Sequence, residues 1–529
     1  MNEDFGHGLL SVDLKNQKTM LVKTFGSALN GIEAITVTIE VNIDRGVQFF
    51  LVGLPDSAVK ESQQRIEAAL CNNDLKYPKK KITINMAPAD IRKEGSSYDL
   101  PIAIAILAAS EQVSVEMLDK YVIMGELSLD GSLNPIRGVL PIAIRAMQDG
   151  FKGIILPMAN AREAAVVETL DVYGVNNIME VISFLNGASR LRPVEIPKYE
   201  EDGEDMYAFD FSDVRGQENI KRALEVSAAG SHNVILIGSP GSGKTMLAKR
   251  MPTIMPPMTL KEALETTKIH SVVGLVGDGL SLLKARPFRS PHHTTSYVGL
   301  VGGGAYPQPG EISLAHNGVL FLDELPEFKR NVLEVLRQPM EDRLVTIARA
   351  KQTIEFPANF MLVAAMNPCP CGYYNHPTQE CTCQPGSVEK YLNRISGPLL
   401  DRIDLHVEVV PVPFEELSKK NLGERSSEVR ARVTRARKIQ TERFADIPNI
   451  HSNAQMTSRL IQKYCSLDEQ CSILLKNAMD RLNLSARAYD RILKVSRTIA
   501  DLAGSEDIKE EHLAEAIQYR SLDRETWGK

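Results

Sequence analysis

The sequence predicts a multidomain α/β protein, and three observations support this fold class. A glycine-rich segment, residues 238–245, lies between a run typical of a buried strand and a run typical of a helix. A second apolar run, residues 318–322, is followed by two acidic residues. Residues 20–190 alternate short β-type runs with helical patterns. A chain of 529 residues is long enough for about three to four domains.

The N-terminal region, residues 20–190, is predicted to form a separate domain of strands and helices. Residues 35–41 (ITVTIEV) predict a strand, and residues 57–70 predict an amphipathic helix. The longest apolar stretch, residues 100–109, is about half as long as a membrane-spanning helix. Residues 1–5 lack the basic start of a secretion signal. We therefore expect a cytoplasmic protein without a membrane partner.

Composition divides the remainder of the chain into a linker and two further regions. Residues 191–212 contain two prolines and an acidic run, which predicts a solvated linker. Residues 213–413 contain the glycine-rich segment and the acidic pair, and we expect them to form the core domain. Residues 414–529 predict a helical domain. Its clearest helical patterns are residues 485–502 and 509–516.

The glycine-rich segment has the residues of a phosphate-binding loop, directly after a strand-like run. Its glycines allow consecutive backbone N–H groups to face a phosphate. Lys244 supplies a positive charge for the β- and γ-phosphates, and Thr245 supplies a hydroxyl ligand for Mg²⁺. The helix expected to follow adds its N-terminal dipole to the same site. The loop consists of Gly238, Ser239, Pro240, Gly241, Ser242, Gly243, Lys244 and Thr245.

The acidic pair Asp323 and Glu324 follows an apolar run that suits a strand buried on both faces. The Asp323 carboxylate can hold Mg²⁺, and the Glu324 carboxylate can polarise an attacking water. Alone, such a pair is more often a solvated strand end. Together with the phosphate-binding loop it predicts a Walker B element, so we expect hydrolysis of ATP with Mg²⁺ as cofactor.

Three further polar residues follow in the order found in AAA+ ATPases. Residues 360–366 predict another buried strand, and Asn367 at its end can orient the attacking water. Arg402 follows a Pro-Leu-Leu turn, and Arg487 lies at the start of a predicted helix. Each arginine alone is more often a surface or ion-paired residue. In this order the three resemble sensor 1, an arginine finger acting on a neighbouring subunit, and a sensor 2 acting within its own chain.

The chain from residue 20 onward resembles the YifB/ComM family of the magnesium-chelatase-type AAA+ clade. The resemblance includes residues 288–294 (FRSPHHT), 302–304 (GGG) and 309–318 (PGEISLAHNG). It implies a Lon-protease-like α+β N-terminal domain of the ribosomal S5 type, an AAA+ core and a helical lid. It also implies a hexameric ring that translocates on DNA and migrates branches, with recombination proteins as possible partners. Residues 1–19 form an extension outside the resemblance.

The N-terminal domain resembles a protease domain but lacks the residue that would activate its nucleophile. Ser97 falls at the position of the nucleophilic serine of Lon. The second catalytic residue of Lon is a lysine after a similar Pro-Ile turn, whereas Leu140 follows the turn in this chain. A serine without a base is a weak nucleophile. We therefore expect this domain to be non-proteolytic.

Four of the seven cysteines cluster in a polar, turn-rich segment. The odd number and the lack of a signal peptide argue against a disulfide framework. The cluster predicts either a four-thiol metal site, with Zn²⁺ the preferred ion, or a set of free cysteines. Its spacing of one residue departs from the usual two, and His376 could replace one thiol. Its members are Cys369, Cys371, Cys381 and Cys383. The pair of histidines at 292 and 293 has no carboxylate at metal-ligand spacing and is interpreted as structural.

DNA binding would require a local basic surface, because the net charge of the chain is −6. Residues 344–354 predict a β-hairpin with Arg349 and Lys351 near its tip, and its position resembles the pore hairpin of ring helicases. An ordinary exposed turn with basic residues is the alternative. Two other functions remain open, a metal-chelatase motor subunit and an ATP-switched assembly scaffold. The first lacks an Asp-x-Ser-x-Ser metal-adhesion motif, and the second does not explain Glu324.

Overall fold

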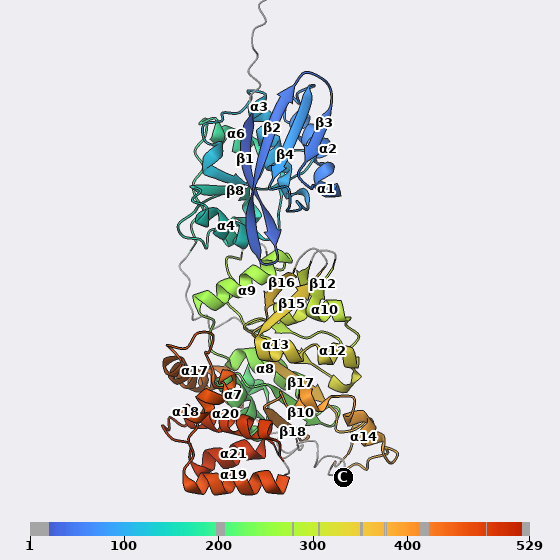
Figure 1. Ribbon diagram of the computed structural model, residues 1–529, viewed down its shortest axis with the longest axis vertical. Helices are drawn as coiled ribbons and strands as arrows, with labels where there is room; N and C mark the ends of the chain where they lie inside the picture. Colours follow the sequence, from blue (N-terminus) through green and yellow to red (C-terminus); the bar gives the residue numbers. More distant parts are fainter. Residues whose placement is uncertain are drawn as a thin grey trace, which may run out of the picture. The chain divides into compact units, whose positions relative to one another are not determined.

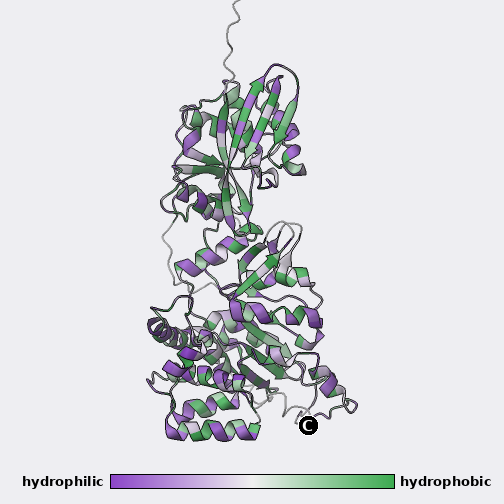
Figure 2. Ribbon diagram, in the orientation of Figure 1, coloured by the Kyte–Doolittle hydropathy of each residue, from purple (hydrophilic) through white to green (hydrophobic). Residues whose placement is uncertain are grey.

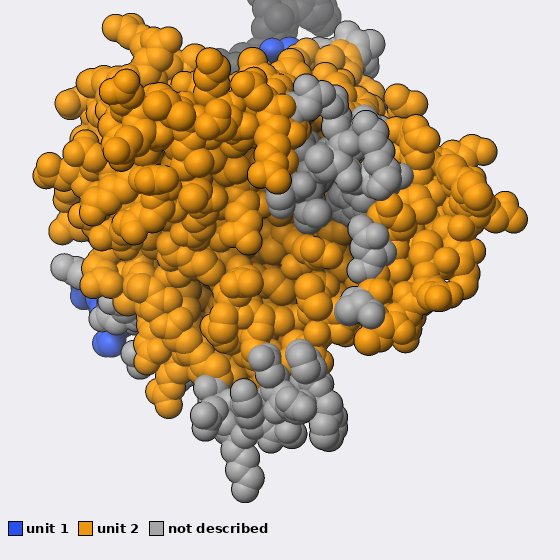
Figure 3. Space-filling view, turned by 90° about the horizontal axis from the view of Figure 1, so that it is seen from below, with its two compact units in different colours: residues 1–197, 277–281 blue, residues 198–276, 282–529 orange. Residues whose placement is uncertain are grey.

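The computed structural model describes most of the chain as two compact units (Figure 1). Unit 1 comprises residues 1–197 and 277–281, and unit 2 comprises residues 198–276 and 282–529, drawn in orange in Figure 3. The described residues are 21–196, 207–277, 280–304, 307–349, 353–374, 376, 378–412, 423–482 and 484–520. The predicted extension 1–19, about half of the predicted linker and Lys351 lie outside them.

Unit 1 is built on a mixed sheet of seven strands in the order β3-β4-β2-β1-β5-β8-β9. The antiparallel pairs are β1 with β2 and β2 with β4, and the remaining neighbours run parallel. The predicted strand 35–41 is confirmed within β2. The bounds are β1 Val22–Asn30, β2 Glu33–Asp44, β3 Phe49–Val52, β4 Lys81–Ala87, β5 Tyr121–Ile123, β8 Gly153–Pro157 and β9 Asp171–Val175. A small hairpin joins β6 (Glu126–Leu127) and β7 (Leu133–Asn134).

The helices of unit 1 include one that accounts for the longest apolar stretch. Every residue of α3 from Asp99 to Ala108 is buried, so this stretch forms a core helix. The single helix predicted at 57–70 is instead two, because the chain turns at Glu61. Within the described part of the chain, no helix combines the length and apolarity needed to cross a bilayer. The bounds are α1 Ser57–Lys60, α2 Ser62–Asn72, α3 Asp99–Ala109, α4 Val139–Gln148, α5 Met158–Ala164 and α6 Ile178–Leu185.

Unit 2 contains a parallel sheet of five strands in the order β11-β14-β17-β10-β18. Every residue of β10, β14 and β17 is buried, as expected for a sheet covered on both faces. The order places β17 between β10, which precedes the glycine-rich loop, and β14, which precedes the acidic pair. The bounds are β10 Val234–Gly238, β11 Phe288–Arg289, β14 Val319–Leu322, β17 Met361–Met366 and β18 Leu405–Val409.

Helices cover this sheet, and the C-terminal helices share its hydrophobic core. One cluster of buried side chains joins β10, β14 and β17 to α7 and α8 and to α17–α21. In Figure 2 the outer helices, such as α19, alternate between hydrophilic and hydrophobic residues along their length. The longer helices are α7 Glu218–Gly230, α8 Lys244–Ile254, α9 Leu260–Val272, α17 Ser426–Arg443, α18 Ser458–Tyr464, α19 Glu469–Leu482, α20 Ala486–Leu502 and α21 Glu510–Gln518. The shorter ones are α10 Tyr297–Val301, α11 Glu311–Leu314, α12 Arg330–Glu334, α13 Arg337–Asp342, α14 Ser387–Leu392 and α15 Gly397–Leu400.

Two short hairpins complete unit 2. The predicted hairpin at 344–354 is confirmed, since β15 (Leu344–Ala348) pairs antiparallel with β16 (Thr353–Pro357). A second hairpin, which the sequence did not indicate, pairs β12 (Gly302–Gly303) with β13 (Gln308–Pro309).

Candidate active site

The glycine-rich loop connects the end of β10 to the start of α8, as predicted. Gly241 and Gly243 have φ angles of 78° and 91°, a conformation that residues with a Cβ rarely adopt. Helix α8 begins at Lys244, so the first amides of the helix point toward the loop. The local structure is therefore that of an anion-binding loop at a helix N-terminus.

The Lys244 ammonium lies inside this loop. Its Nζ donates to the carbonyl oxygens of Gly238 at 2.8 Å and Ser239 at 2.9 Å. It also lies 3.3 Å from Oδ1 of Asn367, the residue that follows β17. Burial lowers the pKa of Lys244, and the nearby Asp323 carboxylate opposes this shift. The structure thus brings together Lys244 and Asn367, which are 123 positions apart in the chain.

The acidic pair follows the carboxyl end of β14 and lies beside this loop. The Thr245 hydroxyl donates to Oδ2 of Asp323 at 2.7 Å, although their strands are separated by β17. A hydroxyl and a carboxylate oxygen side by side are ligands of the kind that Mg²⁺ prefers. The donor set therefore fits the ion that the sequence predicts, and Thr245 and Asp323 are the residues that would hold it.

Glu324 has a partner that the sequence did not indicate. Its backbone adopts a left-handed conformation with φ 51°, and its Oε2 lies 3.2 Å from Nδ1 of His293. His293 follows β11, the strand that pairs with β14 at the edge of the sheet. No carboxylate lies near His293 in the local sequence, so only the order of the strands reveals this contact.

Arg402 lies at the amino-terminal edge of the sheet, where the parallel strands begin, whereas the glycine-rich loop lies at the carboxyl-terminal edge. It precedes β18, whose Leu405 is opposite Val234, the first residue of β10. The five residues of β10 separate the two edges by about 16 Å at 3.3 Å per residue. The Arg402 guanidinium donates to the Pro398 carbonyl at 2.7 Å and pairs with Glu341 at 2.5 Å. It cannot reach the loop of its own chain from this position.

Arg487 lies at the same edge as Arg402. Its NH1 is 3.4 Å from Oδ2 of Asp401, the residue before Arg402. Arg487 is the second residue of α20. Thr498 of the same helix contacts His232, which lies just before β10. The action of Arg487 on the nucleotide of its own chain stays a prediction, since in this structure Arg487 does not lie at the glycine-rich loop. The physical reason is that α20 packs at the amino-terminal edge of the sheet, whereas the loop lies at the carboxyl-terminal edge.

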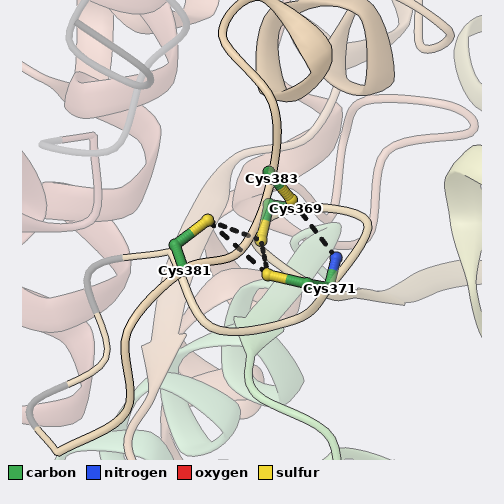
Figure 4. A group of neighbouring side chains, drawn as sticks. All are labelled: Cys369, Cys371, Cys381 and Cys383. Atoms are coloured by element: carbon green, nitrogen blue, oxygen red, sulfur yellow. Dashed lines mark hydrogen bonds between the residues drawn. The ribbon is translucent and has the colours of Figure 1, made fainter.

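The four clustered cysteines point toward one another (Figure 4). Their sulfur atoms all lie within 4.8 Å of one another, and the group does not include His376. The Nδ1 of His376 instead accepts hydrogen bonds from the backbone of the turn at 378–379. None of the seven cysteines forms a disulfide, in agreement with the sequence. The cluster lies directly after Asn367, on the segment between β17 and α14.

The two hairpins of unit 2 contact each other through Arg349. Its Nε donates to the carbonyl of Gly304 at 3.3 Å, and its guanidinium packs near Gly303. Arg349 is exposed at the end of β15, as predicted. Lys351 lies outside the described residues.

In unit 1 the residue that stands in place of the Lon lysine offers no base. Leu140 is fully buried, and its backbone N–H donates to Oε1 of Glu163 at 3.0 Å. Beside Ser97, the Ser96 hydroxyl donates to the Glu126 carboxylate. That this domain is non-proteolytic stays a prediction.

The fold and the site define an AAA+ ATPase, because a phosphate-binding loop, an acidic pair and Asn367 meet on three adjacent parallel strands. Family models agree with this class. Residues 210–417 match magnesium chelatase subunit ChlI, residues 39–160 match a second model of that subunit, and residues 423–520 match its C-terminal region. The chain belongs to the YifB/ComM family of magnesium-chelatase-like AAA+ proteins.

Two relatives cover nearly the whole chain. The competence protein ComM of Haemophilus influenzae is 47% identical over 511 residues, which span 95% of this chain and 98% of that protein. YifB of Escherichia coli is 45% identical over 496 residues, which span 93% and 96%. Lon protease 2 of Bacillus subtilis is 29% identical over 189 residues, or 30% of this chain and 33% of that protein. The likeness to Lon is thus weak and partial, and a Lon-like N-terminal fold stays a prediction.

Proposed function

We propose that the protein is a hexameric, ATP-driven DNA translocase of the ComM type that migrates branched DNA in recombination or natural transformation. The observation that carries the proposal is the position of Arg402. It lies at the sheet edge opposite the glycine-rich loop of its own chain, where its guanidinium pairs with Glu341. In a ring it would exchange this partner for the phosphates of a neighbouring subunit's nucleotide, so identical subunits would complete one another's sites.

In this proposal ATP binds at the glycine-rich loop with Mg²⁺ held by Thr245 and Asp323. Mg²⁺ would neutralise charge on the phosphates during hydrolysis. Lys244 exchanges its loop carbonyls for phosphate oxygens, and Glu324 accepts a proton from the attacking water. Asn367, already beside Lys244, orients that water. We also propose Zn²⁺ for the four-cysteine cluster, a cytoplasmic location and recombination proteins as partners.

DNA would be bound by the β15–β16 hairpin at the centre of the ring. The chain has a net charge of −6, so only a concentrated basic surface can attract DNA. In a hexamer, six copies of Arg349 and Lys351 would place about twelve cations around one pore. Binding should therefore weaken steeply with salt, because each neutralised phosphate releases counterions.

The test compares the double variant Arg349→Ala/Lys351→Ala with wild type in an ATPase assay and in a branch-migration assay. We expect ATP hydrolysis without DNA to persist, because Arg349 lies on a hairpin outside the nucleotide site. Stimulation by DNA and movement of branches should be lost. The matched control is Arg435→Ala/Lys438→Ala, which removes two exposed cations from α17.

Two results would redirect the proposal. A double variant that moves branches like wild type would exclude the hairpin as the DNA contact. Wild-type protein that hydrolyses ATP but neither binds DNA nor responds to it would favour the ATP-switched scaffold. The chelatase alternative would require stimulation by a tetrapyrrole and a metal ion instead.

A further inference from the structure

Three of the four sulfur atoms of the cysteine cluster lie near the spacing of a tetrahedral metal site, and the fourth, of Cys383, lies within 4.8 Å of the others. A Zn–S bond of about 2.3 Å places the corners of a tetrahedron about 3.8 Å apart. The Cys369 sulfur lies 3.3 Å from that of Cys371 and 3.8 Å from that of Cys381. The sulfurs of Cys371 and Cys381 are 3.5 Å apart. These distances are much longer than the roughly 2.05 Å of a disulfide bond, so the thiols converge without bonding to each other.

Backbone amides surround these sulfurs as they would surround thiolates. The N–H of Cys371 donates to the sulfur of Cys383 at 3.4 Å. Backbone hydrogen bonds also reach Cys369 from Tyr374, and Cys371 from Tyr373 and Thr382. The backbone N–H of Cys383 donates to the sulfur of Cys381. Each of the four sulfurs thus accepts at least one backbone hydrogen bond, which fixes its direction.

The cysteine segment packs directly on the nucleotide loop. A Cβ added at Gly372, between the two halves of the cluster, would lie 2.5 Å from Cδ of Pro240. Pro240 is a residue of the glycine-rich loop. On the other side of the cluster, the hydroxyl of buried Tyr391 in α14 receives a hydrogen bond from the backbone of Asn367. The segment therefore contacts the phosphate-binding loop at Pro240, and both the start of the segment and α14 after it adjoin Asn367.

We propose that the four cysteines bind one Zn²⁺ ion, and that this ion braces the active site by holding Gly372 against Pro240 and Asn367 beside Lys244. Four thiolates in a tetrahedral arrangement form a closed structural site, without an open position for substrate. Without the ion, the four sulfurs lose the common bonding partner that would fix the conformation of the segment. The bracing role rests on the proposed ATP site, whereas the metal site does not.

The first test measures the metal in the full-length protein. We expect about one zinc per chain by elemental analysis, lost in Cys369→Ser and Cys383→Ser. Cys71→Ser is the matched control, because Cys71 is an exposed cysteine of unit 1, and this variant should keep its zinc. Should the cluster variants fail to fold, Co²⁺ exchanged into wild type should give thiolate charge-transfer and tetrahedral d–d absorption bands. Absence of these bands together with metal-free protein, or the presence of iron instead, would overturn the assignment.

The second test separates the brace from the metal site. Gly372→Ala leaves all four cysteines in place but drives a methyl group into Pro240. Gly386→Ala is the matched control, because Gly386 has a similar φ of 78° but no neighbour within 4 Å of the added carbon. We expect both variants to keep one zinc. Only Gly372→Ala should weaken binding of a fluorescent ATP analogue and lower kcat, by roughly 10²-fold for a displacement of about 1 Å.

The outcomes distinguish this proposal from the proposed function. Equal nucleotide affinity and equal kcat in the two glycine variants would overturn the brace, even if zinc is present. Protein that carries zinc but hydrolyses no ATP would overturn the proposed function and leave the metal site standing. Protein that translocates on DNA but carries no zinc would overturn the metal site and leave the proposed function standing.

Discussion

At the scale of residues, the site is held together by contacts that nucleotide must replace. Lys244 donates to two carbonyls of its own loop, and Thr245 donates to Asp323. The carbonyl dipoles offset only part of the positive charge of the Lys244 ammonium. A phosphate oxygen offsets it fully, because it carries a negative charge of its own. Nucleotide binding therefore requires Lys244 to release the carbonyls of a loop that is already formed.

The first prediction separates binding from chemistry at this site. Lys244→Ala should abolish ATP binding, because it removes the charge that faces the phosphates. Glu324→Gln should bind ATP with wild-type affinity and stall, because the amide cannot accept a proton from water. The measurements are the affinity for a fluorescent ATP analogue and kcat of hydrolysis. Unchanged turnover in Glu324→Gln would exclude this residue as the base.

The residues of this site differ in how readily the sequence revealed them. Lys244, Thr245 and Asp323 belong to continuous motifs, and their contacts follow once β10 and β14 lie in one parallel sheet on either side of β17. His293 could not be paired with Glu324 in advance, because the pairing depends on β11 lying beside β14. The position of Arg487 was also unpredictable, since the packing edge of α20 is decided by buried contacts with Asp404 and His232.

At the scale of elements, a buried carboxylate ties helix α20 to the sheet. Asp404 precedes β18 and is 1% exposed. It accepts from the Asn233 amide at 3.1 Å and pairs with His232 at 3.2 Å and with Arg491 of α20 at 3.0 Å. Desolvation alone would raise the pKa of Asp404, but Arg491 and His232 hold it well below its usual value of 3.8. The charged form is therefore the one that stabilises the fold.

The second prediction concerns this tie and its dependence on pH. Asp404→Asn leaves Arg491 without its buried partner and should lower the free energy of unfolding by about 3–5 kcal/mol at neutral pH. Because the folded pKa is depressed, this contribution is complete above the unfolded pKa and is lost as the pH falls through the folded value. The difference between wild type and variant should thus narrow below about pH 4.

Urea unfolding of unit 2 at several pH values measures this difference. The matched control is Asp480→Asn on α19, an exposed position where the same chemical change should cost little. A constant difference between Asp404→Asn and wild type from pH 7 to the acid limit of the native state would contradict a stabilising carboxylate.

Elements were predicted well where periodicity was strong and poorly where it was short. The strand predicted directly before the glycine-rich segment, the strand at 360–366 and the helix at 485–502 all lie within one residue or two of their observed bounds. The β12–β13 hairpin has two residues per strand, too few for any alternation to be visible. The order of the strands also could not be deduced locally, since parallel neighbours are joined by long crossover connections.

At the scale of the whole molecule, each chain carries an ATP site at one sheet edge and two arginines at the other. Arg402 and Arg487 lie near each other beside Asp401 and far from their own loop. In the proposed ring, such a charge would contribute to hydrolysis when another subunit presents its loop to it. Activity would then depend on oligomerisation.

The third prediction tests this dependence by mixing inactive subunits. Arg402→Ala and Lys244→Ala should each be inactive alone. In mixed rings, an intact loop of an Arg402→Ala subunit meets the arginine of a Lys244→Ala subunit, and hydrolysis should recover at that interface. An arginine finger accelerates hydrolysis by about 10³–10⁵, so the recovery should be plain in an ATPase titration.

The control for mixing is a chain that carries both changes. Combined with Arg402→Ala subunits, it offers no interface with an intact loop and an arginine, so activity should stay absent. Lack of recovery with the single variants, in rings shown to exchange subunits, would count against a role for Arg402 in trans.

The parallel pair β10 and β18 has a consequence for how information would travel around such a ring. One end of the pair carries the chain's own phosphate-binding loop, and the other end adjoins Arg402, which in the proposed ring would serve the next nucleotide. Two strands paired along their whole length form a rigid element through which a displacement at one end could reach the other. Each subunit would then report the state of its nucleotide to one neighbour and not to the other, and hydrolysis would proceed around the ring in a fixed direction.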